Sequence, residues 1–334
     1  MGFRQDNRAS ESGIGQCLHE NNGECGMEGE SRMKAIVLHA YGGPEELRYE
    51  DSEIPQFGDN EVLVRVRATS VNPVDYKIRS GAAKARMPVD FPAILGRDLA
   101  GEVVDAGRNV TGFPKGMRVM ALANGTYAEY TVARADVLAP IPEALDFEKA
   151  AALPLVVTTG AQLIERAVKA QAGWTVLVTG ALGSVARSAI HVARQHGAKV
   201  LAGVREKEKN EAATLAADGV IAIDSEEEIK KLHDLDAIAD TVGGTAIQRL
   251  FKTLKPGGVI GSVLGAPDGA REHNLRVEAM MAVPDASRLY QLADENGRNQ
   301  FNIPIARTMK LDQAAEAHRL AENGGVGGKI VLVP

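Results

Sequence analysis

The stretch that most constrains this chain runs from Val176 to Ile190 and reads Val-Leu-Val-Thr-Gly-Ala-Leu-Gly-Ser-Val-Ala-Arg-Ser-Ala-Ile. An apolar, β-branched run enters a glycine turn and continues as a helix, so the turn leaves backbone N–H groups bare at the helix start, where they bind phosphate. The spacing Ala181-x-Gly183-x-x-Ala186 is a relaxed form of the dinucleotide fingerprint G-x-G-x-x-G/A. An ordinary strand–turn–helix without a ligand is the alternative.

A second pattern that indicates phosphate binding follows the next predicted strand, Lys199–Val204. In dinucleotide-binding folds that select NAD, an acidic residue about 20 positions beyond the glycines binds the ribose 2′-hydroxyl. Arg205 stands at that place, with Lys207 and Lys209 behind it, and a cation there suits a 2′-phosphate. This pattern predicts NADP(H). The alternative is a solvated helix start, because two glutamates lie between the cations and weaken the local field.

Length and composition limit the class of protein. With 334 residues the chain is long enough for about two domains. A chain that is 45% hydrophobic, with 35 glycines and a net charge of −6, fits a soluble α/β protein without an electrostatic footprint for nucleic acid. No apolar run is long enough for a membrane span. Both cysteines, Cys17 and Cys25, lie near the N-terminus, so a reducing, cytoplasmic setting is the simplest expectation.

The chain divides into three predicted parts. Residues 1–32 are rich in Gly, Glu, Asn and Ser and are expected to form a disordered N-terminal extension. Residues 33–153 contain short strands separated by Gly, Pro and Asn turns, which is typical of an antiparallel, barrel-like domain. In residues 154–290 strands and helices alternate, which predicts a doubly wound parallel sheet. The tail, 291–334, is expected to return to the first domain, and the fold class is α/β.

The strands of the parallel sheet end near small residues, such as Gly243 and Gly265, at the edge where ligands of open α/β sheets bind. The predicted strands are 33–38, 62–68, 99–104, 116–122 and 126–132 in the first domain, 176–179, 199–204, 219–223, 237–241 and 257–263 in the second, and 328–333 in the tail, after a helix over 311–322.

Seven segments, taken in order, resemble the medium-chain dehydrogenase/reductase superfamily, and specifically its zinc-free quinone oxidoreductase (zeta-crystallin-like) branch. The segments are Met33–Ile36, Ser70–Gly81, Leu95–Gly101, Ala150–Pro154, the glycine turn after Val176, Leu254–Gly258 and Gly328–Leu332. The resemblance covers Met33 to Pro334. It implies a GroES-like catalytic domain, over 33–153 and 291–334, joined to a Rossmann NADP-binding domain over 154–290.

The resemblance also implies chemistry without a metal. Zinc-dependent relatives have a Cys where Asn72 stands and a His where Arg97 stands, and a guanidinium has no lone pair to give zinc. The implied reaction is hydride transfer from NADPH to a quinone or an α,β-unsaturated carbonyl compound. Such acceptors delocalise the developing charge themselves, so one hydrogen-bond donor suffices. The family's habit is a homodimer formed through the sheet edge of the nucleotide domain.

The residues expected at the site follow from these matches. Asn72 would orient the nicotinamide or the acceptor, and Tyr76 would donate to the acceptor oxygen; the alternatives are an Asn-Pro turn residue and a packing aromatic. Asp75 is expected to be a buried structural carboxylate. The cofactor-binding residues are expected to be Thr159, Gly180, Ala181, Gly183, Ser184, Val185, Arg205, Lys209 and Gly265.

Two other function classes stay open. A zinc alcohol dehydrogenase is less favoured, because Asn72 and Arg97 conflict with its ligand set. A non-enzymatic NADPH-binding protein, similar to the family members that serve as lens crystallins or RNA-binding proteins, is the other alternative. The acceptor itself is not specified by these residues.

Overall fold

The computed structural model describes residues 32–270 and 272–334 of the chain. The predicted extension over 1–31 lies outside these residues. Arg32, which was assigned to the extension, is instead the first residue of strand β1 (Arg32–Leu38) and pairs with Glu53. Within the described ranges, none of the helices has the length and apolarity that crossing a membrane requires.

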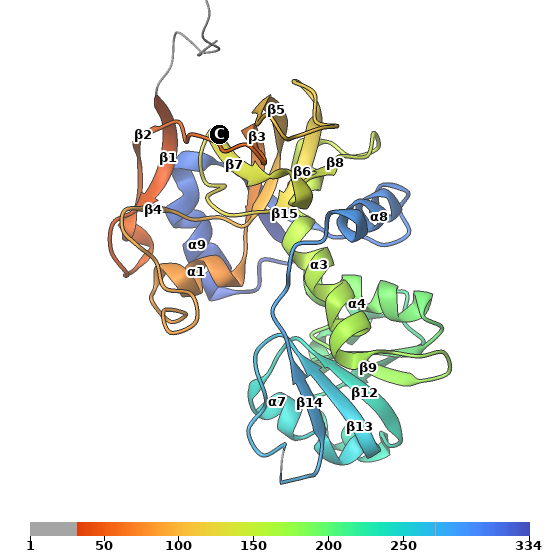
Figure 1. Ribbon diagram of the computed structural model, residues 1–334. Helices are drawn as coiled ribbons and strands as arrows, with labels where there is room; N and C mark the ends of the chain where they lie inside the picture. The colour runs from red at the N-terminus through yellow and green to blue at the C-terminus, as the bar shows by residue number, and fades with distance from the viewer. Residues whose placement is uncertain (1–31, 271) are drawn as a thin grey trace, which may run out of the picture. The chain divides into compact units, whose positions relative to one another are not determined.

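The N-terminal strands form two mainly antiparallel sheets, with the C-terminal strands added to one of them (Figure 1). The three-stranded sheet has the order β2-β1-β4, with β2 at Leu47–Glu53 and β4 at Ala93–Ile94. The second sheet has seven strands: β3 (Glu61–Val71), β5 (Asp98–Ala106), β6 (Arg118–Leu122), β7 (Tyr130–Arg134), β8 (Ala139–Pro140), β15 (Ile305–Lys310) and β16 (Lys329–Val333). Since β16 pairs antiparallel with β3, the tail joins the N-terminal strands. These two sheets together are called the first sheet system below, and the parallel sheet described next is the second.

The middle of the chain forms a six-stranded, wholly parallel sheet with the order β11-β10-β9-β12-β13-β14. Its strands are β9 (Thr175–Thr179), β10 (Lys199–Val204), β11 (Gly219–Ala222), β12 (Leu235–Asp240), β13 (Leu254–Ser262) and β14 (Arg276–Ala279). In Figure 1, β9, β12, β13 and β14 run side by side in this sheet. The order reverses at β9, where chain connections leave to either side, so the end of β9 is the natural ligand position. The predicted fold class is therefore confirmed.

The α-helices are α1 (Pro73–Arg79), α2 (Phe147–Ala151), α3 (Pro154–Gln162), α4 (Ser184–Gln195), α5 (Lys209–Ala212), α6 (Glu226–Lys231), α7 (Gly244–Gln248), α8 (Ala286–Gly297) and α9 (Ala314–Asn323). α3 continues as a π-helical turn over Leu163–Val168. Short 3-10 turns cover 44–46, 135–137, 206–208, 251–253 and 311–313.

Some predicted boundaries were wrong. The strand expected over 126–132 begins only at Tyr130, because Ala128 forms a single isolated bridge with Ala35. The helix expected from residue 311 starts with a 3-10 turn and becomes α-helical at Ala314. Strands β2, β4, β8, β14 and β15 were not predicted. The predicted domain limit between residues 290 and 291 falls inside α8.

Close packing of α3 on α4 connects the two sheet systems at the site. A Cβ on Gly160 would lie 2.5 Å from the carbonyl oxygen of Val185 and 2.7 Å from Cβ of Ser188, so only glycine allows this approach. The hydroxyl of Ser188 donates to the carbonyl of Val157 at 3.2 Å. The start of α4 is therefore fixed against a helix that leaves the first sheet system.

Candidate active site

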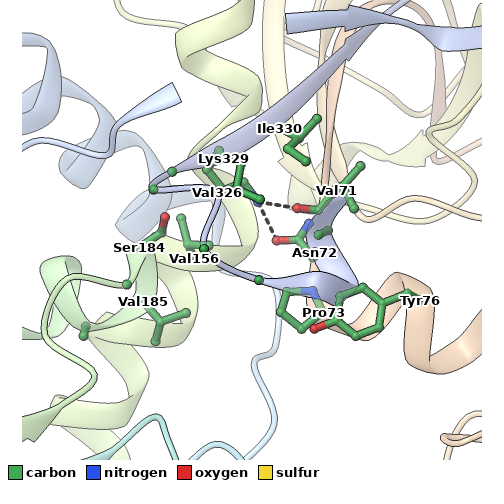
Figure 2. Close-up of a pocket in the computed structure, with 17 residues that line it drawn as sticks. Val71, Asn72, Pro73, Tyr76, Val156, Ser184, Val185, Val326, Lys329 and Ile330 are labelled. Carbon is green, nitrogen blue, oxygen red and sulfur yellow. Dashed lines mark hydrogen bonds between the residues drawn. The ribbon is translucent and has the colours of Figure 1, made fainter. Parts of the chain in front are cut away.

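A cavity of about 390 Å³ is lined mainly by three separate stretches of chain, with Val156 of α3 beside them (Figure 2). One wall is the start of α1, with Asn72, Pro73 and Tyr76, and another is the start of α4, with Gly183–Ala186. The third is the glycine-rich segment Gly324–Ile330. Figure 2 shows Ser184 and Val185 across the cavity from Pro73 and Tyr76. The structure thus brings together five of the expected site residues: Asn72, Tyr76, Gly183, Ser184 and Val185.

The glycine turn before α4 is shaped by Gly180 more than by Gly183. Gly180 has φ +62°, and a Cβ there would approach Oγ1 of Thr241 to 2.8 Å, so this position requires glycine. Gly183 has an ordinary φ of −72° and is the N-cap of α4. The nearest atom to an added Cβ at Gly183 would be the Gly180 carbonyl oxygen, at 3.1 Å. A side chain there is compatible with the backbone conformation, but the Gly180 carbonyl would have to move by a few tenths of an ångström to admit it.

The first turn of α4 fits a diphosphate. Among the described residues, no hydrogen bond engages the N–H groups of Ser184, Val185 and Ala186, whereas the N–H of Gly183 donates to the carbonyl of Gly180 at 2.8 Å. Such free N–H groups, with the positive end of the helix dipole, favour an anion. α4 has 12 residues and carries no acidic residue in its first turn. The residues present therefore suit the phosphate bridge of a dinucleotide.

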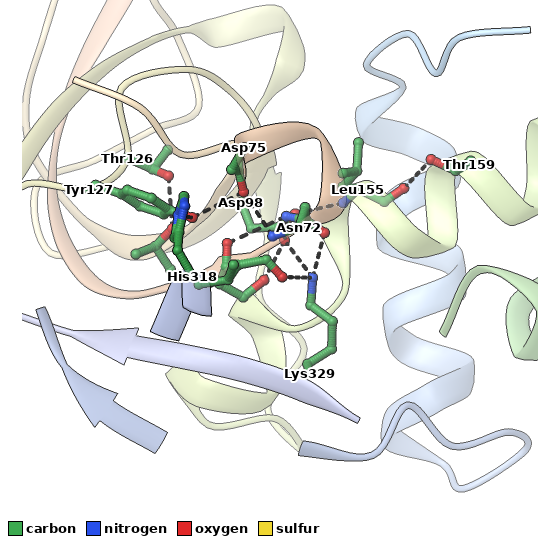
Figure 3. Close-up of polar contacts among 12 residues, drawn as sticks. Asn72, Asp75, Asp98, Thr126, Tyr127, Leu155, Thr159, His318 and Lys329 are labelled. Carbon is green, nitrogen blue, oxygen red and sulfur yellow. Dashed lines mark hydrogen bonds and ion pairs between the residues drawn. The ribbon is translucent and has the colours of Figure 1, made fainter. Parts of the chain in front are cut away.

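Asn72 is fully buried and its amide is bonded to side chains, not to its own turn (Figure 3). Nδ2 donates to Oδ2 of Asp98 at 2.7 Å, and Oδ1 accepts from Nζ of Lys329 at 2.5 Å. The contact of Nδ2 with the Ser70 carbonyl is longer, at 3.4 Å. Both amide hydrogens point into the protein, so only the second lone pair of Oδ1 is left for a ligand.

Asp98 and Lys329 form a buried ion pair behind Asn72. Their side chains are 0% and 5% exposed, and Nζ of Lys329 lies 3.2 Å from Oδ2 of Asp98. Asp98 also accepts from the hydroxyl of Ser70 and, through Oδ1, from the backbone N–H of Leu155 at 2.7 Å. Since Leu155 is in the first turn of α3, this carboxylate ties β3, β16 and the start of α3 to one point.

A second buried polar group is centred on Asp75, in the first turn of α1. Oδ2 of Asp75 accepts from the N–H of Asn72 at 2.8 Å and from the hydroxyl of Tyr127 at 3.0 Å, whereas Oδ1 has no partner among the described residues. Burial, reinforced by the charge of Asp98, raises the pKa of Asp75 to about 7. Burial and the nearby Arg79 lower the pKa of His318 to about 3. Asp75 is thus a buried carboxyl group, as expected.

Tyr76 lines the cavity, and its hydroxyl makes no hydrogen bond to the described residues, whereas its backbone carbonyl accepts from the N–H of Ser80 at 2.9 Å. Burial, with the charge of Glu322, raises the pKa of its phenol, so the hydroxyl stays protonated and can donate. Across from it, the N–H groups of Gly325, Val326 and Gly327 have no partner within the described ranges. The free donors of this cavity are therefore a phenol and two groups of backbone amides.

The two expected 2′-phosphate cations are already paired. Nε of Arg205 donates to Oε1 of Glu208 at 2.8 Å, and Nζ of Lys209 donates to Oε1 of Glu228. Neither residue lines the cavity. They follow β10, at the carboxyl edge of the parallel sheet, which is the place expected for the ribose of a dinucleotide.

Four other expected cofactor residues lie outside the cavity lining: Thr159, Gly180, Ala181 and Gly265. The Thr159 hydroxyl donates to the carbonyl of Leu155 at 2.6 Å, one turn earlier in α3, so it is engaged within its own helix. Ala181 is buried, and its N–H donates to the carbonyl of Gly203 at 3.1 Å. Gly265, with φ +104°, lies in the loop after β13.

The contacts of Arg97 are relevant to metal binding, because the resemblance places it where zinc-dependent relatives have a histidine. Nη1 of Arg97 donates to Oδ1 of Asn124 at 2.8 Å, and its Nε has no partner in the described part of the chain. In residues 32–270 and 272–334, no three His, Cys, Asp or Glu side chains gather as a metal site would need.

Sequence reasoning missed Asp98 and Lys329 as site residues. Both stand inside segments that were used only as family markers. A usable signal was present: Lys329 opens the otherwise apolar strand Lys-Ile-Val-Leu-Val, and Asp98 follows directly on Arg97 at the start of an apolar strand. A charge on a strand that is buried on both faces needs a partner, and the two are of opposite sign.

Comparison with known proteins places these features in a family. Residues 58–143 match the alcohol dehydrogenase GroES-like domain, and residues 215–332 match a zinc-binding dehydrogenase domain. The quinone oxidoreductase of Lama guanicoe is 34% identical over 330 residues, which cover 91% of this chain and 98% of that protein. The NADPH-dependent alkenal/one oxidoreductase of Arabidopsis thaliana is 31% identical, over 90% of this chain and 80% of the relative.

Some similarities are more local. The quinone oxidoreductase of Mus musculus is 40% identical over 186 residues, so the matched part of the chain spans only 56% of that protein. Among solved structures, the quinone oxidoreductase of Coxiella burnetii has a TM-score of 0.82 at 29% identity, covering 91% of this chain and 99% of that one. The Escherichia coli quinone oxidoreductase, solved in complex with NADPH, has a TM-score of 0.79 at 25% identity, over 90% of this chain and all of that one.

Proposed function

We propose a reductase function for this chain, which belongs to the quinone oxidoreductase branch of the medium-chain dehydrogenase/reductase superfamily. It would transfer hydride from NADPH to a quinone or to the β-carbon of an α,β-unsaturated carbonyl compound. One observation carries the proposal: the free N–H groups at the start of α4 face the Asn72–Tyr76 segment across a single cavity. The relatives named for quinone and for alkenal/one reduction support both acceptor classes.

The cofactor would supply the hydride, and the chain would bind it through residues of both sheet systems. The N–H groups of Ser184 and Val185 would hold the diphosphate, and Gly183 would leave room for its oxygens. Arg205 would hold the 2′-phosphate at the edge of the sheet. The remaining lone pair on Oδ1 of Asn72 would accept from the nicotinamide amide, which would orient the ring.

Tyr76 would donate a hydrogen bond to the acceptor oxygen, where negative charge develops during reduction. Its raised pKa keeps the donor hydrogen in place, and a donor already positioned in a partly buried site stabilises that charge without reorganisation. Asp98 and Lys329 would not touch the acceptor. They hold the Asn72 amide in one orientation.

An NADPH-oxidation screen tests this function. Quinones, 2-alkenals and cyclic enones would each be offered as acceptors, with and without a chelator, and we expect turnover of at least one class that the chelator does not change. Loss of turnover with the chelator would contradict the metal-free mechanism. Saturable NADPH binding without turnover of any acceptor would instead favour the non-enzymatic alternative.

We also propose a homodimer. β14 is the edge strand of the parallel sheet, and the chain just after it exposes Met281 and Val283, at 67% and 52%. Pairing of β14 with its copy would satisfy the free edge and cover these side chains. Light scattering should give twice the chain mass of 35.4 kDa, and a monomer would contradict the pairing.

A further inference from the structure

The three cations that follow β10 differ in how they are held. Lys209 is paired with Glu228, whose Oε2 accepts from the N–H of Ala222 at 2.7 Å, so that carboxylate is fixed to the end of β11. Lys207 is exposed and forms no ion pair with the described residues. Arg205, the residue at the 2′-phosphate position, is paired with Glu208 three residues later.

Arg205 holds both oxygens of the Glu208 carboxylate. Oε1 accepts from Nε at 2.8 Å and from Nη2, and Oε2 accepts from the backbone N–H of Arg205 at 3.1 Å. The Arg205 side chain is 59% exposed, whereas that of Glu208 is 24% exposed. The carboxylate is thus clamped at the start of the 3-10 turn, while the other edge of the guanidinium faces solvent.

We propose that Glu208 competes with the ribose 2′-phosphate for Arg205 and thereby sets the cofactor preference of this chain. This inference rests on the proposed function, because it concerns the same nucleotide site. A 2′-phosphate that binds at Arg205 approaches a guanidinium whose positive charge is already balanced by the Glu208 carboxylate. Glu208 is then a specificity-determining residue, and the binding of NADH, which has no 2′-phosphate, does not depend on it.

The expected size of the effect follows from the exposure of the pair. Measured exposed ion pairs are worth up to about a fivefold change in an equilibrium constant. Removing the Glu208 charge should therefore tighten NADPH binding by about two- to fivefold, and added salt should reduce this increase in affinity. Glu208→Gln is the suitable variant, because the amide oxygen can still accept from the N–H of Arg205 and keep the turn capped.

Glu206 provides the matched control. It lies in the same turn, is 62% exposed, and approaches Lys209 only to 3.9 Å, without a contact to Arg205. Glu206→Gln therefore removes the same charge from the same segment but leaves the Arg205–Glu208 pair in place. Arg205→Ala and the Arg205→Ala/Glu208→Gln double variant complete a double-mutant cycle.

The experiment measures dissociation constants for NADPH and NADH by nicotinamide fluorescence, without any acceptor. We expect Glu208→Gln to lower the Kd for NADPH by about two- to fivefold and to change that for NADH by less than about twofold. Glu206→Gln should change both by less than about twofold, and Glu208→Gln should have as little effect when Arg205 is Ala.

Three results would overturn the inference while leaving the proposed function intact: an unchanged Kd for NADPH in Glu208→Gln, equal tightening for NADH, or the same gain in Glu206→Gln. A gain that persists without Arg205 would also overturn it. Failure of the wild-type chain to bind either nucleotide would overturn both the inference and the reductase proposal.

Discussion

The ammonium nitrogen of Lys329 lies 2.5 Å from the amide oxygen of Asn72, although 257 positions separate the two residues in the chain. All three hydrogens of the ammonium are used, since it also donates to Asp98 and, at 3.3 Å, to the carbonyl of Val71. The last strand, β16, thus contributes a residue to the site. Side chains from β5 and β16 together hold the Asn72 amide in place.

Replacing Lys329 should lower the free energy of unfolding substantially. Lys329→Met leaves the buried carboxylate of Asp98 without its cation, and breaking a buried pair in this way costs about 3–5 kcal/mol of unfolding free energy. Urea denaturation measures the loss. The control is Lys255→Met, which removes the partly exposed pair with Asp236 and should cost less than about 1 kcal/mol. Similar losses in the two variants would contradict a special role for the Lys329–Asp98 pair.

The two glycines of the turn before α4 should separate folding from binding. Gly183→Ala is compatible with φ −72° and needs only a small shift of the Gly180 carbonyl, so we expect a smaller loss of stability than for Gly180→Ala and a Kd for NADPH raised about tenfold or more. Gly180→Ala forces alanine to φ +62° and should cost about 1–2 kcal/mol or more of stability. Denaturation and fluorescence titration of both variants test this, and unimpaired binding in Gly183→Ala would argue against a diphosphate at this turn.

Tyr76 should act in the reductive step and not in cofactor binding. Tyr76→Phe removes the one side-chain hydroxyl donor proposed for the acceptor, so kcat/KM for the acceptor should fall about tenfold or more while the Kd for NADPH is unchanged. Tyr130→Phe is the control, because the Tyr130 hydroxyl bonds Arg65, away from the cavity lining. Equal activity of Tyr76→Phe and the wild type would show that Tyr76 only packs.

Two buried groups on either side of the Tyr127 hydroxyl, Asp75 and His318, predict an unusual dependence of stability on pH. The pKa of Asp75 is raised to about 7, so its contribution is full at acid pH and is lost as pH rises from about 4 towards 7. The pKa of His318 is lowered to about 3, so its contribution is full above about pH 6.5 and is lost as pH falls. Between about pH 4 and 6.5 the two slopes oppose each other.

Asp75→Asn removes one of these slopes. Relative to the wild type, the unfolding free energy of the variant should rise with pH between about 4 and 6.5, with a slope that approaches about 1.4 kcal/mol per pH unit. Urea denaturation at several pH values gives the difference. A difference that does not vary with pH would contradict the raised pKa of Asp75.

Local patterns in the sequence were enough to predict most of the longer strands of both sheet systems and the position of the glycine turn, because strand alternation and the turn before α4 are encoded within short segments. They did not reveal the Asp98–Lys329 pair, because its members come from β5 and β16 and meet only in the folded chain. They also placed Arg205 correctly at the end of β10 but could not show that Glu208 occupies its guanidinium. The glutamates were predicted to weaken the field, whereas the structure shows one direct partner.

A crystal structure of the chain with NADPH tests the central claim most directly. The account predicts the diphosphate on the N–H groups of Ser184 and Val185, the 2′-phosphate at Arg205, and the nicotinamide in the cavity beside Asn72 and Tyr76. Density for the nucleotide anywhere else, or side chains that close the cavity beside Gly183 when NADPH is present, would contradict it.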